Sequence, residues 1–164
     1  MINVRELHPD DWEVWRDLRI AALAEAPYAF HSRLEEWLGV GETAWRERLA
    51  APGRYFVADL DGRPAGMACA IPPDPEGIAD LLSLWVAPHG RGLGIGDALV
   101  SAVLAQAAAW HAERLALHVV IGNDAASGLY RRHGFADFGT VARPDGVVEI
   151  RMERPVPQDL PHRS

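Results

Sequence analysis

The sequence has 164 residues, of which 49% are apolar, enough for one sizeable hydrophobic core in a single domain. Its formal net charge of −7 argues against nucleic-acid binding, which needs a clustered positive surface, although a local pair such as Arg131-Arg132 still allows a small anionic ligand. The single cysteine, Cys69, excludes an intrachain disulfide and a cysteine-based metal cluster. The seven histidines form no H-E-x-x-H pair or other close ligand set, so we predict no metal site.

The chain lacks obvious targeting features. Its first residues have neither the basic segment nor the long apolar core of a signal peptide, and no uncharged stretch approaches membrane-spanning length. We therefore expect a cytoplasmic protein that binds neither membranes nor nucleic acid. We also expect one domain over residues 1–154, followed by a flexible tail over residues 155–164.

The first third of the chain reads as a strand followed by helices. Residues 2–7 are a short strand candidate, and apolar side chains recur at helical spacing over 12–23. Ser32 to Glu35 has the S-x-x-E form of a capping box, which predicts a second helix start. This helix is expected to be interrupted near 39–41 and to resume over 45–49.

The middle of the chain has strand patterns. Two β-rich runs, 54–60 and 63–71, flank the pair Asp61-Gly62, a strong signal for an antiparallel hairpin. The apolar run over 79–86 predicts a central strand that is buried on both faces.

The last third alternates helices and strands. The expected elements are a helix over 97–111, a strand over 115–121, a helix over 125–133 and strands over 135–141 and 147–152. The resulting order, β-α-α-β-β-β-α-β-α-β-β, predicts an α/β (α+β) domain in which a mixed sheet has helices on both faces. The β-α-β stretch predicts a pair of parallel strands, and chemistry in such sheets gathers at the carboxyl ends of adjacent strands.

A glycine-rich turn, Arg91-Gly92-Leu93-Gly94-Ile95-Gly96, separates the predicted central strand from the helix that follows it. Glycines permit positive φ and close approach, so several backbone N–H groups can face an anion, while the helix dipole and Arg91 add positive charge. The spacing does not fit the dinucleotide pattern G-x-G-x-x-G, and the chain has no lysine for a Walker loop. The turn therefore predicts a phosphate site of another kind.

The remaining pattern, R-x-x-G-x-G after a strand, resembles the GNAT family of N-acetyltransferases. A second signature of that family, an asparagine followed by a helix with tyrosine ahead of Gly-Phe, is matched by Asn123, Tyr130, Gly134 and Phe135. The resemblance covers most of the chain and is weakest before Arg54. It implies the GNAT-like acyl-CoA N-acyltransferase fold and transfer of an acetyl group from acetyl-CoA to a primary amine by direct attack. It also implies contacts to coenzyme A from Trp85, Val86, Arg91, Gly92, Leu93, Gly94, Ile95, Gly96, Asn123 and Tyr130.

Two catalytic roles have candidates. Tyr130 is the best general acid, because a phenol with an ordinary pKa of about 10 can protonate a departing thiolate; the alternative is a ring that only fills the core. Asp80 is the first choice for the base, with a solvated strand-end carboxylate as the alternative. Glu35, Glu36 or a water chain ending at Ser83 could serve instead.

Several other residues have two interpretations. Asn123 is a helix N-cap, a coenzyme contact or both. Tyr28, Phe30, His31 and Trp37 lie in the segment that resembles the family's acceptor wall, so they line an amine pocket or fill the core.

Two residues outside the motifs are expected to be structural. Cys69 has no motif partner and is expected to be a small buried hydrophobe, and His118 on an apolar strand is expected to be a sheet residue.

The sequence leaves the acceptor open between a small-molecule amine and the amine of a peptide or protein. It also leaves open whether the acyl group is acetyl or slightly longer. A homodimer is one expectation, because exposed closing strands often let such folds associate. The alternative to an enzyme is a noncatalytic acyl-CoA-binding regulatory module on the same fold.

Overall fold

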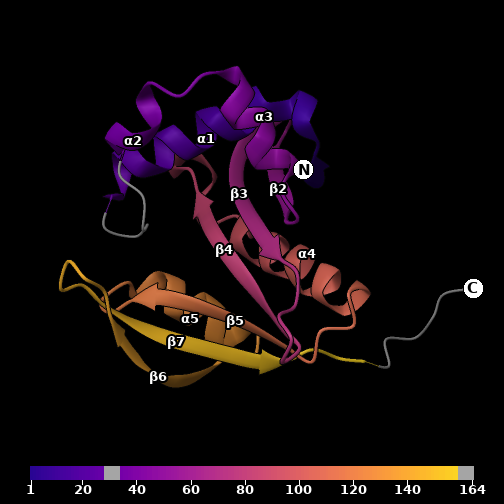
Figure 1. Ribbon diagram of the computed structural model, residues 1–164, viewed down its shortest axis with the longest axis vertical. Helices are drawn as coiled ribbons and strands as arrows, with labels where there is room; N and C mark the ends of the chain where they lie inside the picture. Colours follow the sequence, from indigo (N-terminus) through magenta and orange to yellow (C-terminus); the bar gives the residue numbers. More distant parts are fainter. Residues whose placement is uncertain (28–33, 159–164) are drawn as a thin grey trace, which may run out of the picture.

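The computed structural model describes residues 1–27 and 34–158. Its strands form one seven-stranded mixed sheet with the order β1-β2-β3-β4-β5-β7-β6 (Figure 1). Strands β4 and β5 run parallel, whereas the five other described neighbour pairs are antiparallel. The strands are β1 (Ile2–Leu7), β2 (Arg54–Leu60), β3 (Arg63–Ile71), β4 (Ile78–Val86), β5 (Arg114–Val120), β6 (Ala136–Ala142) and β7 (Val148–Pro155).

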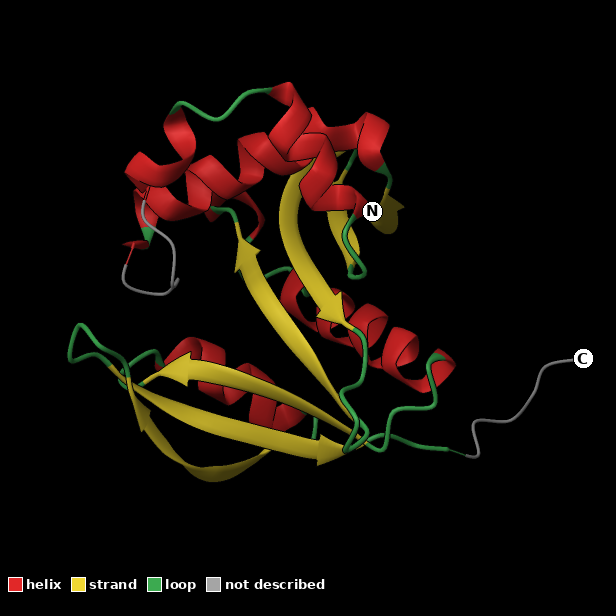
Figure 2. Cartoon of the chain, viewed as in Figure 1, coloured by secondary structure: helices red, strands yellow, loops and turns green. Residues whose placement is uncertain are grey.

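Helices lie on both faces of this sheet, as the element order predicts (Figure 2). On one face are α1 (Trp12–Glu25), α2 (Leu34–Leu38) and α3 (Glu42–Ala50), and on the other are α4 (Ile95–Ala109) and α5 (Asp124–Arg132). The interruption between α2 and α3 agrees with the predicted break, while the proposed cap at Ser32 lies outside the described residues. The predicted mixed α/β architecture is confirmed.

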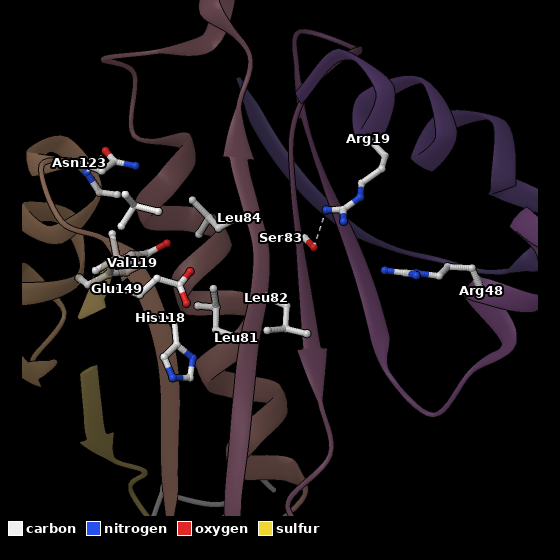
Figure 3. Close-up of a pocket in the computed structure, with 13 residues that line it drawn as sticks. Arg19, Arg48, Leu81, Leu82, Ser83, Leu84, His118, Val119, Asn123 and Glu149 are labelled. Atoms are coloured by element: carbon white, nitrogen blue, oxygen red, sulfur yellow. Dashed lines mark hydrogen bonds between the residues drawn. The ribbon is translucent and has the colours of Figure 1, made fainter. Parts of the chain in front are cut away.

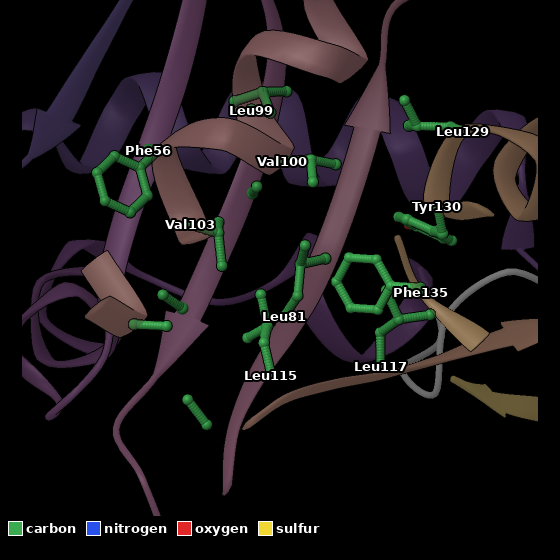
Figure 4. Close-up of a cluster of buried hydrophobic side chains, with 14 of the residues drawn as sticks. Phe56, Leu81, Leu99, Val100, Val103, Leu115, Leu117, Leu129, Tyr130 and Phe135 are labelled. Carbon is green, nitrogen blue, oxygen red and sulfur yellow. The ribbon is translucent and has the colours of Figure 1, made fainter. Parts of the chain in front are cut away.

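Strand β2 shows how one sheet separates two cores. Phe56 belongs to the cluster that α4 closes with Leu99 and Val103 (Figure 4). Its neighbour Tyr55 points to the other face, where its ring packs edge-on against Trp15 of α1 with centroids 4.9 Å apart. Alternate side chains of a strand face opposite sides, so both faces of this strand are covered.

Strand β4 differs from its prediction. It pairs with β5 over residues 78–80 and 114–116, and beyond Asp80 the two strands diverge (Figure 1). A register shift against β3 coincides with a left-handed backbone at Ser83, where φ is 58°. Because β5 no longer covers this part, Leu82 is 44% exposed, so the expectation that the whole strand is buried on both faces is wrong.

The hairpin prediction is confirmed. Asp61 and Gly62 both have positive φ, 50° and 84°, as a tight two-residue turn requires. Strand β7 runs to Pro155, and Val156 is buried and donates its N–H to the carbonyl of Glu113 at 2.9 Å. The sheet thus reaches Pro155 and buried packing reaches Val156, while the division at residue 154 stays a prediction. None of the helices in the described ranges is both long and apolar enough to span a membrane.

Candidate active site

The glycine turn leads directly into α4, which begins at Ile95, two residues before its predicted start. Gly92 and Gly94 have φ values of 77° and 91°, a conformation that side-chain-bearing residues rarely adopt. Gly94 is the N-cap and no side chain caps the helix there, so the N–H groups of the first turn are available to an anion. A Cβ on Gly96 would come within 3.0 Å of Leu129, so this glycine lets α4 and α5 pack closely.

A cavity of about 620 Å³, here named the turn cavity, lies along this turn. It brings together most of the residues that the resemblance assigns to coenzyme A. Leu93 is the exception on the turn, since it is 55% exposed and is not among the lining residues. The predicted residues that line the turn cavity are Trp85, Val86, Arg91, Gly92, Gly94, Ile95, Gly96 and Asn123.

Glu25, at the end of α1, also lines the turn cavity and was not predicted. Nη2 of Arg91 lies 2.6 Å from each of its carboxylate oxygens, and Nε of Arg91 donates to the carbonyl of Val86 at 3.0 Å. Trp85 Nε1 donates to the same carboxylate at 3.2 Å. The hydrogen bond from Arg91 is the main reason that the pKa of Glu25 lies below its ordinary value.

Arg132 supplies a second positive group to the turn cavity. Its guanidinium is 3.2 Å from Asp97, whose carboxylate also lies 2.8 Å from Nε2 of His133. The contact with His133 is the largest influence that lowers the pKa of Asp97. The turn cavity is thus lined by two arginines, Arg91 of the glycine turn and Arg132 of α5, and guanidinium groups of this kind suit a polyanionic ligand.

A smaller cavity of about 230 Å³, here named the cleft cavity, lies where β4 and β5 diverge (Figure 3). Leu84, Asn123 and Ala126 line both cavities, so the two adjoin. The polar and charged side chains around the cleft cavity are Arg19, Arg48, Ser83, His118, Asn123, Tyr130 and Glu149.

Tyr130 packs in the apolar core and also lines a cavity, while its role as general acid stays a prediction. Its ring packs against Phe135 with centroids 5.9 Å apart, and the residue is only 6% exposed within the apolar core (Figure 4). It also lines the cleft cavity, next to the wall shared with the turn cavity. Burial raises the pKa of Tyr130, which keeps the phenol protonated at neutral pH.

Asp80 lies apart from these groups. It pairs with Ala116 at the closed end of the β4–β5 cleft, and in the described part of the chain it lines neither cavity. Burial is the main reason that its pKa is raised. Glu35 and Glu36, on α2, are likewise absent from both linings, whereas Ser83 faces the cleft cavity and its Oγ accepts a hydrogen bond from Arg19.

Of the predicted acceptor-wall residues, Tyr28, Phe30 and His31 lie outside the described residues. Trp37 packs on the ring of Trp45 with centroids 4.9 Å apart, and among described residues it belongs to neither cavity lining. It serves there as part of the apolar packing.

The sequence patterns did not identify several side chains that line the cleft cavity, but they correctly predicted that the cysteine is buried. His118, expected to be structural, lines the cavity, as do Arg19 and Glu149 from two distant elements. Cys69 is 2% exposed, which confirms it as a buried residue.

Within residues 1–27 and 34–158, no three His, Cys, Asp or Glu side chains are close enough to hold a metal ion. A metal-free site stays a prediction.

Comparison with known proteins identifies the family. The model of the acetyltransferase (GNAT) family matches residues 5–135. The chain belongs to this family. The resemblance seen in the glycine turn and in the segment from Asn123 to Phe135 is thereby confirmed.

Curated relatives of this GNAT chain match it over about half of its length. It is 34% identical to a mycothiol acetyltransferase of Streptomyces avermitilis over 54% of this chain and 29% of that protein. It is 38% identical to an uncharacterized N-acetyltransferase of Mycobacterium tuberculosis over 57% of this chain and 60% of the relative. The chain thus spans less than two thirds of both relatives.

Solved structures share the GNAT fold across nearly the whole chain. A phosphinothricin acetyltransferase from Sinorhizobium meliloti, in complex with acetyl-CoA, superposes with a TM-score of 0.78 at 19% identity, covering 94% of this chain and 88% of that one. A putative acetyltransferase from Salmonella typhimurium, with its cofactor acetyl-CoA, gives 0.76 at 17% identity over 100% and 97% of the two chains. At these identities the likeness establishes the fold.

Proposed function

We propose that this protein transfers the acetyl group of acetyl-CoA to a primary amine, which attacks the thioester directly. The observation that carries the proposal is the wall common to the two cavities, formed by Leu84, Asn123 and Ala126. A donor held along the glycine turn would bring its reactive end to this wall, and an acceptor in the cleft cavity would meet it there. Family membership supports the same reaction class.

The turn cavity fits the diphosphate of coenzyme A. Gly92 and Gly94 hold a backbone that leaves N–H groups of the turn and of the first turn of α4 facing outward. Nothing lies within 4 Å of the position that a Cβ would take on Gly92, so the backbone there is open to a ligand. Arg91 and Arg132 would add charge-assisted contacts to phosphate oxygens.

The reaction forms a C–N bond and breaks a C–S bond. The lone pair of the neutral amine attacks the thioester carbon, and backbone N–H groups near Trp85 and Val86 are the proposed donors to the carbonyl oxygen. Collapse of the adduct releases the thiolate of coenzyme A. The amine gives up one proton to solvent or to a nearby base, and the thiolate takes up one proton, for which Tyr130 is the proposed donor.

Direct attack is supported by the state of Cys69. Burial raises the pKa of its thiol to about 11, so the nucleophilic thiolate is scarce at neutral pH. Among described residues it lines neither cavity, which makes it a poor candidate for an acyl-enzyme intermediate. The proposed base is on the β5–β7 side of the cleft cavity, where Glu149 and His118 lie, rather than at Asp80.

The proposal is tested by following thiol release from acetyl-CoA across a panel of primary amines. Tyr130→Phe should lower turnover about 10²-fold, the usual size of a general-acid contribution, and leave coenzyme A affinity within about twofold. The melting temperature checks that the ring still fills the core. Unchanged turnover would remove Tyr130 from the mechanism, and tight acetyl-CoA binding without turnover on any amine would favour the noncatalytic module.

A further inference from the structure

The cleft cavity has walls of opposite charge. Figure 3 shows the guanidinium groups of Arg19 and Arg48 on one side of β4 and the side chains of Glu149 and His118 on the other. These groups come from four elements, α1, α3, β5 and β7. An occupant of the cavity therefore meets cations at one end and, at the other, the carboxylate of Glu149, which also lies 3.8 Å from Nη1 of Arg143.

Arg19 is held firmly at the cationic end. It is only 4% exposed, which is rare for arginine, and its Nη1 donates to Ser83 Oγ at 2.9 Å. Ser83 itself lies at the irregular point of β4 where φ is 58°. The irregular point of β4 beside the cleft cavity thus also supplies the hydroxyl that holds this guanidinium.

Arg48 approaches the same end from α3. Its guanidinium lies over the ring of Trp37, 4.9 Å from the centroid, which fixes it beside the cavity. Burial, and then the charge of Arg48, lower the pKa of Arg19 to about 10, so both groups remain positive at pH 7. Placing two like charges together in a partly dehydrated site opposes folding, and a bound anion between them would offset that cost.

The volume and the lining of the cleft cavity restrict which ligands could carry this anionic group. A volume of about 230 Å³ is below the roughly 300–1,000 Å³ typical of pockets for drug-sized ligands. The apolar part of the lining consists of three leucines of β4 together with Val119, Val120 and Ala126; the leucines are Leu81, Leu82 and Leu84. The site suits a small molecule with an anionic group, an amine and a modest apolar part.

We propose that the acceptor is a small amino acid whose free carboxylate binds Arg19 and Arg48 and whose amine points to the wall shared with the turn cavity. A planar carboxylate matches the fork of guanidinium donors. Glu149 attracts the ammonium form to the opposite end, and transfer of one proton from it to the proposed base, Glu149 or His118, yields the neutral attacking amine. This inference rests on the proposed acetyl transfer and specifies the acceptor of that same site.

The first experiment compares matched acceptors in the thiol-release assay: leucine, leucinamide and isopentylamine. Removing the carboxylate charge should lower kcat/KM about 10²-fold or more, because the buried Arg19 and the partly buried Arg48 would then face a neutral group. Equal rates for the acid and its amide, or better turnover of peptides than of free amino acids, would overturn the inference while leaving amine acetylation in place. If none of the amines in the panel gives thiol release, both proposals are overturned.

The second experiment identifies the residues. Arg48→Gln should raise KM for the amino acid about tenfold and leave both KM for acetyl-CoA and kcat/KM for the amide unchanged. Arg46→Gln is the matched control on the same helix, since Arg46 is bound to Asp10 and Glu42 outside the cavity. It should leave each of these kinetic constants unchanged. An Arg48→Gln variant that loses acid and amide turnover equally would contradict a carboxylate-binding role.

Discussion

Arg91 and Glu25 lie 66 residues apart in sequence, yet the Nη2 atom of the arginine is 2.6 Å from both carboxylate oxygens. The arginine expected to bind phosphate is therefore bound to an acid that belongs to the same cavity. A phosphate group that enters the turn cavity must compete with Glu25 for this guanidinium. It must also approach the negative charge of the Glu25 carboxylate.

Glu25→Gln should therefore tighten coenzyme A binding. Both side chains are partly exposed, 51% for Arg91 and 34% for Glu25, so the ion pair is worth at most about 1 kcal/mol, or roughly fivefold in Kd. Titration calorimetry at low salt measures the gain, which should shrink as added salt screens the charges. Glu13→Gln, on the same helix but outside the turn cavity, is the control. Weaker binding by Glu25→Gln would mean that Glu25 organises the site.

Gly94→Ala and Gly128→Ala should have opposite effects on stability. Gly94 has a φ of 91°, so an alanine there should lower the free energy of unfolding by about 1–2 kcal/mol and weaken acetyl-CoA binding. Gly128 lies within α5 with nothing within 4 Å of an added Cβ, so an alanine should raise the free energy of unfolding by about 0.5–1 kcal/mol. Urea denaturation measures both. A fully stable Gly94→Ala protein would show that the left-handed turn is not required.

Local patterns explain what the sequence could predict. The turn at Asp61-Gly62, the turn glycines before α4 and the amphipathic run of α1 each depend on neighbouring residues, and their predictions hold. The apolar run of β4 was misread at its carboxyl end. Hydrophobicity indicates a strand but does not reveal where its neighbour β5 diverges, which leaves Leu82 exposed.

The chemistry of the cleft cavity was harder to predict because distant elements build it. Arg19 looks like one charged position in a helix, and Glu149 like one in a closing strand, until the fold places both at a single cavity. The choice of Asp80 as the base depends on its position before the apolar residues of β4. The structure places it where β4 still pairs with β5, before the two strands diverge, and its catalytic role stays a prediction.

Two substitutions of Asn123 should distinguish its role as a helix cap from a role in ligand binding. Its Oδ1 accepts a hydrogen bond from the N–H of Ala126 at 3.3 Å, and the residue lines both cavities. Asn123→Ala should lower the free energy of unfolding by about 1 kcal/mol, whereas Asn123→Ser keeps a capping oxygen and most of the stability. Both variants should weaken acetyl-CoA binding to a similar extent in calorimetry. Affinity that follows stability instead would assign Asn123 to capping alone.

Asp80→Asn should leave turnover within about twofold of the parent, since Asp80 precedes Leu84 at the shared wall by four strand residues, or about 13 Å. Stability provides an independent readout. Burial raises the pKa of Asp80 in the folded protein above its unfolded value, so the destabilisation from its charged form grows as the pH rises from the unfolded to the folded pKa and is complete above the folded pKa.

The asparagine variant should therefore be more stable than the parent at pH 7, and this advantage should disappear as the pH falls and the parent's Asp80 takes up its proton. Thermal unfolding at a series of pH values from 7 down to about 4 follows the difference, and thiol release at each pH follows turnover. A large loss of turnover with no pH-dependent gain in stability would restore Asp80 as the base. The expected pair of results would direct the search for the base to Glu149 and His118, which line the cleft cavity beside Tyr130.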